Sequence, residues 1–214
     1  MSTIKSDPPF VVLENVLTKK EADFVIQYFR ENEKREDRKG YSSTDLPSVS
    51  DGYYQKIKAE SIDERIRPLL RVLNVCRDYF QENYVIKHKL EFKRSFLNKM
   101  TDSAKVLLHS DDNDVYKDKR INEEHYSGIL LLSSPSHYKG GYLSFDNWKE
   151  IKLKPDAGDL VLFKGDNMHS VDPVTEGERI NHIIFFRDVD LNSDLIYADG
   201  QDVEEGRKNA KEYK

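Results

Sequence analysis

Three residues in two short stretches of the chain could hold a metal ion. The first stretch is His109-Ser110-Asp111, and the second supplies His169. Two imidazoles and one carboxylate can occupy one face of an octahedral metal such as Fe(II) and leave three adjacent positions open. Ten residues after His169 comes Arg179, whose planar guanidinium can hold a carboxylate through two hydrogen bonds. Together these residues predict a site that binds iron and an oxo-acid and activates O2.

Taken singly, each of these residues has a simpler explanation. The chain has 6 His among its 214 residues, and about 0.6 His-x-Asp pairs would arise by chance. A single His-x-Asp pair is explained by a solvated loop with a surface histidine, and His169 alone is explained by a histidine that caps a turn. A lone Arg179 would pair with a surface acid at a strand edge. The neighbouring sequence therefore has to decide between these explanations and a metal site.

The neighbouring sequence places the histidines beside strands. Residues 106–108 form an apolar run, so His109 is predicted at the end of a strand. Side chains alternate across a strand, which puts His109 and Asp111 on the same face. A buried strand over 160–163 is followed by a Gly-Asp turn, after which the chain returns at His169. This context favours the metal site.

Arg179 begins a further strand-like stretch. The eight residues that start there read Arg-Ile-Asn-His-Ile-Ile-Phe-Phe, which is typical of a β-strand. Alternation gives Arg179 the same face as Asn181, Ile183 and Phe185. If Arg179 points inward, those three residues line the site as well.

The composition allows one sizeable domain with a polar surface, because 34% of 214 residues are charged and 37% hydrophobic. No apolar run approaches the roughly 20 residues of a membrane helix, and the first residues lack the apolar core of a secretion signal. The single cysteine, Cys76, fits a reducing compartment. A net charge of −5 argues against a broad phosphate-binding surface. We therefore expect a cytoplasmic protein that does not bind membranes; its charge disfavours nucleic-acid binding but leaves room for a local basic groove.

Helices are expected in the first part of the chain. Thr18 and Glu21 form a capping-box pattern, and a helical apolar stripe follows them. A second helix is predicted over 62–84, where Pro68 starts or kinks it. The polar stretch 31–61 between the helices is predicted to be a long connection, which could cover the site or bind a partner.

Strands dominate the rest of the chain. A first strand is predicted over 10–17, and eight more follow the helices, at 90–97, 105–109, 126–133, 141–145, 149–153, 160–163, 169–174 and 179–187. This order predicts an α+β fold, mainly β, in which a double sheet has helical support. We expect a single domain over 1–214, with helical support over about 1–89, a β core over about 90–190 and a charged tail over about 191–214.

Four ordered stretches resemble one known family, the Fe(II)/2-oxoglutarate-dependent dioxygenases. They are His109-Ser110-Asp111, the Gly-Gly-Tyr-Leu-Ser-Phe of 140–145, the Lys-Pro-Asp-Ala-Gly-Asp-Leu-Val-Leu-Phe of 154–163, and residues 169–179. The opening near Phe10, a strand followed by Leu-Thr-x-x-Glu-Ala, is similar to the prolyl 4-hydroxylase-like branch. The resemblance extends to about residue 188. It implies a double-stranded β-helix, or jelly roll, with the metal near one open end.

The resemblance also implies a role for each matching residue. His109, Asp111 and His169 would bind Fe(II). Arg179 would hold the distal carboxylate of 2-oxoglutarate, where many members of the branch have Lys. 2-Oxoglutarate and O2 would be co-substrates, with ascorbate as a further candidate cofactor.

One departure from the family concerns the 2-oxoglutarate site. Members commonly place a Tyr on the strand before the first His, whereas residues 96–100 of this chain contain none. Asn98 is the nearest polar candidate to complete the site, and Tyr126 could supply a hydroxyl from another strand. An ordinary strand aromatic is the alternative for Tyr126.

The implied reaction decarboxylates 2-oxoglutarate to succinate and CO2 and hydroxylates a C–H bond of the substrate. The resemblance implies a prolyl residue in a peptide or protein as that substrate. A free amino acid or another small molecule is an alternative. A nucleic acid is another, because Arg187 lies on the same strand face as Arg179, although the acidic pI argues against it. A different class of explanation is a non-catalytic jelly-roll module whose histidines bind a structural metal or none.

Overall fold

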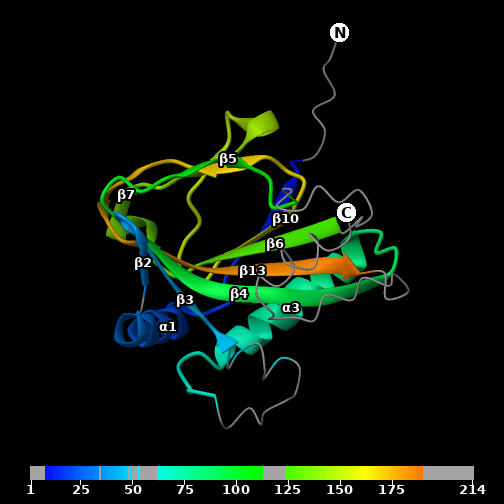
Figure 1. Cartoon of the computed structure of the whole chain (residues 1–214), viewed down its shortest axis with the longest axis horizontal. Coiled ribbons are helices and arrows are strands. Elements are labelled where there is room, and N and C mark those ends of the chain that lie inside the picture. The colour runs from blue at the N-terminus through cyan, green and yellow to red at the C-terminus, as the bar shows by residue number, and fades with distance from the viewer. Residues whose placement is uncertain are drawn as a thin grey trace, which may run out of the picture.

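A computed structural model describes residues 8–33, 35–47, 49, 53, 62–112 and 124–189 of the chain (Figure 1). The predicted charged tail lies outside the described residues. In chain order the elements are β1 Phe10–Leu13, α1 Lys19–Asn32, β2 Arg35–Arg38, β3 Tyr41–Asp45, α3 Pro68–Asn83, β4 Lys89–Met100, β5 Val106–His109, β6 Glu124–Leu131, η2 Pro135–His137, β7 Tyr138–Gly140, β8 Leu143–Phe145, η3 Asp146–Trp148, β9 Lys152–Leu153, β10 Leu160–Lys164, β11 His169–Val171, β12 Val174–Gly177 and β13 Arg179–Val189.

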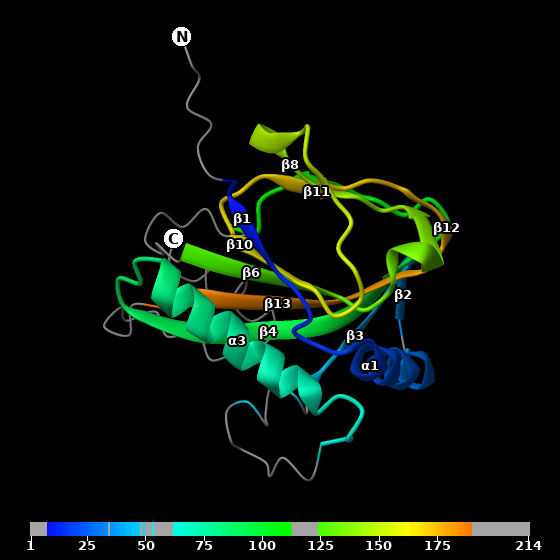
Figure 2. The same ribbon diagram turned by 180° about the vertical axis from the view of Figure 1, so that it is seen from behind.

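The strands form a jelly roll of antiparallel sheets. The large sheet has the order β1-β10-β6-β13-β4-β3-β2, a second sheet has the order β5-β11-β8-β9, and β12 pairs with β7. Figure 1 shows the strands around β5 on one side of the large sheet, and Figure 2 shows α1 and α3 on the other side. The predicted fold, a mainly β jelly roll with supporting helices, is therefore confirmed.

Helix α1 begins where the sequence predicts, and α3 begins at Pro68, six residues after the start of the segment predicted over 62–84. The Thr18 hydroxyl accepts a hydrogen bond from the Glu21 backbone N–H at 3.2 Å, and the Glu21 carboxylate accepts one from the Thr18 N–H at 2.8 Å. This capping box satisfies two otherwise unbonded groups at the start of α1. Pro68 occupies the first turn of α3, where its missing N–H costs nothing.

Two hydrophobic cores lie on the two faces of the large sheet. The outer core joins α1 and α3 to the sheet and includes Val25, Leu73 and Ile184. The inner core joins the large sheet to the four-stranded sheet and includes Phe145 and Phe163. We call the corresponding sides of the large sheet the outer and inner faces. Because side chains alternate along a strand, the residues next in sequence to each functional residue on the inner face point into the outer core.

The segment 31–61 differs from its prediction as a connection, because part of it extends the large sheet. Strand β3 pairs with β4, and Ser42 and Thr44 alternate with more exposed residues along it. Tyr53 packs against the outer-core rings of Phe92 and Phe186. The described parts of the segment therefore extend an edge of the sheet, with Tyr53 packed on the outer face and Tyr41 on the inner face. The prediction failed because β3 is short and polar, and its register comes from β4 rather than from its own hydrophobic pattern.

The other differences between the predicted and the observed elements are small. Strand β1 ends at Leu13, four residues earlier than predicted, since Asn15 takes a turn conformation with φ of 55°. Among its described residues, the region assigned to helical support thus contributes the strands β1, β2 and β3 as well as the helices α1 and α3. None of the described helices combines the length and the apolar character that a membrane crossing requires.

Candidate metal centre

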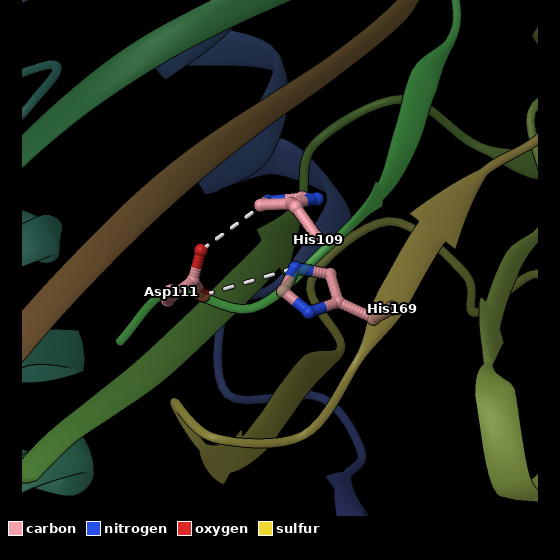
Figure 3. A group of neighbouring side chains, drawn as sticks. All are labelled: His109, Asp111 and His169. Carbon is pink, nitrogen blue, oxygen red and sulfur yellow. Dashed lines mark ion pairs between the residues drawn. The ribbon is translucent and has the colours of Figure 1, made fainter. Parts of the chain in front are cut away.

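His109, Asp111 and His169 converge on one point between the sheets (Figure 3). His109 ends β5 and His169 begins β11, and these two residues pair directly across the four-stranded sheet. The Nε2 atom of His109 lies 3.4 Å from one Asp111 oxygen, and that of His169 lies 3.7 Å from the other. All three candidate ligand atoms lie within 4.8 Å of one another. The structure thus brings together the three residues predicted to bind a metal.

Both imidazoles are oriented by the same kind of hydrogen bond. The Nδ1 atom of each lies 2.9 Å from the backbone carbonyl two residues earlier, that of Leu107 for His109 and that of Asn167 for His169. A carbonyl oxygen only accepts, so each Nδ1 carries a proton, and in the neutral ring each Nε2 is left with the lone pair that a metal can bind. Bonding of one ring nitrogen to a fixed acceptor is how metal-ligating histidines are commonly held.

Asp111 is held through both its side chain and its backbone. The Ser127 hydroxyl, from β6, donates to Asp111 Oδ2 at 2.6 Å, and the Asp111 N–H donates to the Gly165 carbonyl at 2.8 Å. Gly165 itself leaves no room for a side chain, because an added Cβ would lie 2.7 Å from Asp112 Oδ1. Ser127 is a site residue that the sequence prediction missed. The sequence gives no signal for it, because only the packing shows that Ser127 faces inward and the preceding Tyr126 outward.

The three side chains also shift one another's ionisation. The hydrogen bond to Asp111 raises the pKa of His109, whereas burial lowers the pKa of His169. Burial of Asp111 acts to raise its pKa, but the hydrogen bonds from His109 and Ser127 and the charge of His169 outweigh it, so the pKa is lowered. An ionised Asp111 beside a neutral His169 is the state that metal binding requires.

This donor set fits Fe(II). Two imidazole nitrogens and one carboxylate are the ligands of the facial triad, which leaves neighbouring positions for other molecules. The same donors also bind Zn(II), so the ligands alone do not decide the metal. The side chain of His109 is 35% exposed and that of His169 only 5%. The centre is therefore open to solvent on the side of His109.

Arg179 lies on the inner face with its charge buried. It is 2% exposed, and its Nε has no hydrogen-bond partner among the described residues. Burial lowers its pKa, while the neighbouring Tyr138 and Tyr41 hydroxyls act to raise it. The Tyr138 hydroxyl is also buried without a hydrogen-bond partner in the described chain. A buried guanidinium without an acid is costly, so the position fits a site that receives an anion.

A chain of hydrogen bonds lies beside Arg179. Asn181 Nδ2 donates to Asn98 Oδ1 at 2.9 Å, and Asn98 Nδ2 donates to the Tyr41 hydroxyl at 3.0 Å. The sequence prediction named both asparagines and missed Tyr41, which lies in β3 opposite Met100. Tyr41 thus brings a tyrosine hydroxyl to the region where strand β4 has none. The short polar sequence of β3 gave no signal for this position, which follows from the pairing of β3 with β4.

The remaining predicted site residues divide between the two faces. Ile183 packs against the inner core, and Phe185 lies two residues further along the same face. Tyr126 instead lies in the outer core, where its ring contacts Phe80 at a centroid distance of 5.2 Å and its hydroxyl donates to Glu124 at 3.3 Å. The prediction of Tyr126 as a 2-oxoglutarate ligand was wrong, since the side chain points away from Arg179.

Comparison with protein families finds a match to a part of the chain that includes the candidate metal centre. Residues 95–187 match the 2OG-Fe(II) oxygenase superfamily. A PKHD-type hydroxylase of Pseudomonas putida (strain W619) is 48% identical over 54 residues, which are 25% of this chain and 24% of that protein. A PKHD-type hydroxylase of Nitrosomonas europaea is 36% identical over 75 residues, 33% of each chain. The matches thus span no more than about a third of these curated relatives.

Solved structures extend the likeness of fold to most of the chain. The viral collagen prolyl hydroxylase vCPH of Paramecium Bursaria Chlorella virus-1, in its 2OG complex, superposes with a TM-score of 0.65 at 16% identity, over 86% of this chain and 98% of that one. HygX of Streptomyces hygroscopicus, with nickel, 2-oxoglutarate and hygromycin B bound, gives a TM-score of 0.54 at 16% identity over 83% and 82%. The predicted resemblance is confirmed: this chain resembles the Fe(II)/2-oxoglutarate-dependent dioxygenases, and within them the prolyl 4-hydroxylase-like branch.

Proposed function

We propose that this protein is an Fe(II)- and 2-oxoglutarate-dependent dioxygenase that hydroxylates a C–H bond and releases succinate and CO2. The observation that carries the proposal is the convergence of His109, Asp111 and His169, with both Nε2 atoms directed at a shared point. Bound iron would supply the oxygen chemistry. The protein would supply the three ligands, leave neighbouring coordination positions open and shield the reaction between its sheets.

Arg179 is proposed to bind the distal carboxylate of 2-oxoglutarate. The buried Nε of Arg179 and the buried hydroxyl of Tyr138 both lack a protein partner among the described residues, and both can donate to a carboxylate. Asn98 and Asn181 would act through Tyr41, which they tether beside the guanidinium. These contacts would hold the co-substrate in one orientation relative to the metal.

The substrate is proposed to be a prolyl residue of a peptide or protein. Support comes from the collagen prolyl hydroxylase and the PKHD-type hydroxylases that this chain resembles. A small molecule is the second candidate, because HygX has the same fold and binds hygromycin B. The expectation of ascorbate binding stays a prediction, and turnover with and without ascorbate tests it.

The proposal is tested by measuring succinate formed from 2-oxoglutarate under air by the iron-loaded protein, alone and with proline-rich peptides. Asp111→Ala serves as the control and should reduce succinate formation by more than about 100-fold, because loss of a direct ligand exceeds the effect of losing a residue behind it. Turnover that a peptide stimulates would support the prolyl substrate. Turnover without peptide stimulation would favour a small molecule, and no turnover despite bound iron would favour a non-catalytic module.

A further inference from the structure

A β-bulge in β4 places two cations on the inner face. Arg94 and Phe92 pair with consecutive residues of β13, which makes Lys93 the extra residue of the bulge. Phe92 belongs to the outer core, and Ser95 pairs with an outer-core residue of β13. Lys93 and Arg94 therefore both turn to the inner face, where Lys93 Nζ lies 3.3 Å from a ring nitrogen of His125. Bulges commonly re-aim side chains in this way next to active sites.

Arg94 is stacked on one side of two neighbouring aromatic rings, whose centroids are 6.2 Å apart. Its guanidinium carbon lies 5.4 Å from the ring centroid of Phe96 and 5.3 Å from that of Phe185. The two rings are half-buried, whereas Arg94 is exposed. These two contacts therefore position the guanidinium while solvent can still reach it. Contact with ring faces leaves N–H donors of the guanidinium for another group.

Arg94 has no acidic partner among the residues that the structure describes. Arg187, on the same face of β13, lies 3.9 Å from a carboxylate oxygen of Glu91. Within the described ranges, only the two ring contacts are found at the Arg94 guanidinium. A positioned, solvent-accessible guanidinium without an acid is suited to bind an oxyanion through two parallel hydrogen bonds.

Arg94 lies near the metal centre and far from Arg179. Its partner Phe185 also pairs with Ser127, whose hydroxyl holds Asp111. Neighbouring strands are about 4.8 Å apart, so the backbone of Arg94 lies about 10 Å from that of Ser127. Along the strands, Arg179 pairs with β4 at a distance of about 20 Å from Arg94. A 2-oxoglutarate bound between the metal and Arg179 would not reach Arg94, which leaves Arg94 for the second substrate.

We propose that Arg94 binds a carboxylate of the substrate that is hydroxylated, so that this protein acts on acidic substrates. The inference rests on the proposed function and narrows its substrate class. Lys93 adds a second positive charge beside the stacked guanidinium. The carboxylate can belong to a free amino acid or to an acidic side chain in a peptide, because both present the same planar pair of oxygens.

Matched probes that differ only in one carboxylate test the proposal. The first set is the free L-amino acids, each beside its α-amide. The second is acetyl-Gly-Pro-Glu-Gly-amide beside the peptide with Gln in place of Glu. Succinate formed above the substrate-free rate is measured for the wild type, Arg94→Gln, Arg94→Lys and the control Arg67→Gln. Arg67 is an exposed arginine at the start of α3, on the outer side of the sheet.

We expect at least one carboxylate probe to stimulate turnover with a KM about tenfold or more below that of its amide, as for a hydrogen bond to a charged group. Arg94→Gln should abolish this difference, Arg94→Lys should retain part of it, and Arg67→Gln should leave it intact. The substrate-free rate and the KM for 2-oxoglutarate should stay unchanged in all three variants. A response to amino acids alone or to peptides alone would support the proposal and identify the source of the carboxylate.

Other results would overturn the proposal that Arg94 binds a carboxylate of the substrate. These are equal stimulation by acids and amides, no stimulation by any carboxylate probe, or an unchanged acid preference in Arg94→Gln. A raised KM for 2-oxoglutarate in Arg94→Gln with no change in probe preference would also overturn it. In each case substrate-free turnover by the wild type would leave the proposed function standing. Absence of turnover by the wild type both without substrate and with every probe would overturn the proposed function itself.

Discussion

Near the start of β13 both faces bury polar side chains, but the surroundings of those side chains differ. On the outer face, His182 is fully buried among apolar residues, and neither ring nitrogen has a hydrogen-bond partner among the described residues. On the inner face, Asn181 joins a hydrogen-bonded chain beside Arg179. An unpartnered buried polar group costs free energy. A co-substrate bound at Arg179, as proposed, would recover that cost on the inner face, whereas the outer core encloses His182.

Arg179→Gln tests the inner face and should have the largest effect. We expect the KM for 2-oxoglutarate to rise about 10- to 100-fold, because the variant loses a charge-assisted pair with the distal carboxylate. In the absence of 2-oxoglutarate the variant should unfold at the same or a higher temperature, since it no longer buries an unpaired cation. Succinate formation against 2-oxoglutarate concentration and thermal unfolding with and without the co-substrate measure both effects.

Arg179→Lys is the matched variant, because it keeps the charge and loses the planar fork. Its KM should lie between those of the wild type and Arg179→Gln. An unchanged KM in Arg179→Gln, or a loss of stability without 2-oxoglutarate, would mean that the cation is structural.

The contrast between the faces also explains what could be predicted from the sequence. The three candidate metal ligands follow from residue type and spacing, since His109 and Asp111 share a strand end and His169 follows a recognisable strand and turn. The helices follow from the capping box at Thr18 and from Pro68. These features are local, and local patterns determine them.

Tyr126 and Ser127 show where such prediction fails. They are adjacent in β6, and a shift of one residue moves a side chain to the opposite face of a sheet. Residues 126–131 are all buried, so the sequence lacks the alternation of polar and apolar residues that would assign a face. Only the packing of Tyr126 against α3 and of Ser127 against Asp111 settles it.

Tyr41 could not be predicted for a different reason. It reaches the region of Arg179 because β3 pairs with β4 across some sixty positions of sequence. Long-range strand pairing leaves little trace in a short polar strand. The bulge that turns Arg94 inward is equally a property of the pairing between β4 and β13.

His182→Leu tests the outer face and should have an intermediate effect, on stability alone. Burial lowers the pKa of His182 from 6.5 to about 3. Between these values the unfolded chain binds a proton that the folded protein does not, so this group destabilises the fold as the pH falls below 6.5. At pH 5 the wild type should lose about 2 kcal/mol relative to pH 7 through His182, and the variant should not.

Urea unfolding of both proteins at pH 7 and pH 5 measures this difference. Succinate formation at pH 7 should be the same in both, because His182 faces the outer core. Parallel losses of stability in the two proteins would show that His182 does not cause the acid sensitivity. A loss of turnover in His182→Leu would show that the two faces are coupled.

Ser127→Ala should have the smallest effect and compares the two faces most directly. It removes the hydroxyl that donates to Asp111 at 2.6 Å and leaves the strand pairing of β6 in place. Loss of a residue that orients a metal ligand typically lowers metal affinity about 10-fold or more, and Fe(II) titration against a competing chelator measures it. Tyr126→Phe removes a hydroxyl one residue away on the outer face and should leave the affinity unchanged. Equal losses in both variants would mean that general disturbance of β6, rather than the hydrogen bond to Asp111, controls metal binding.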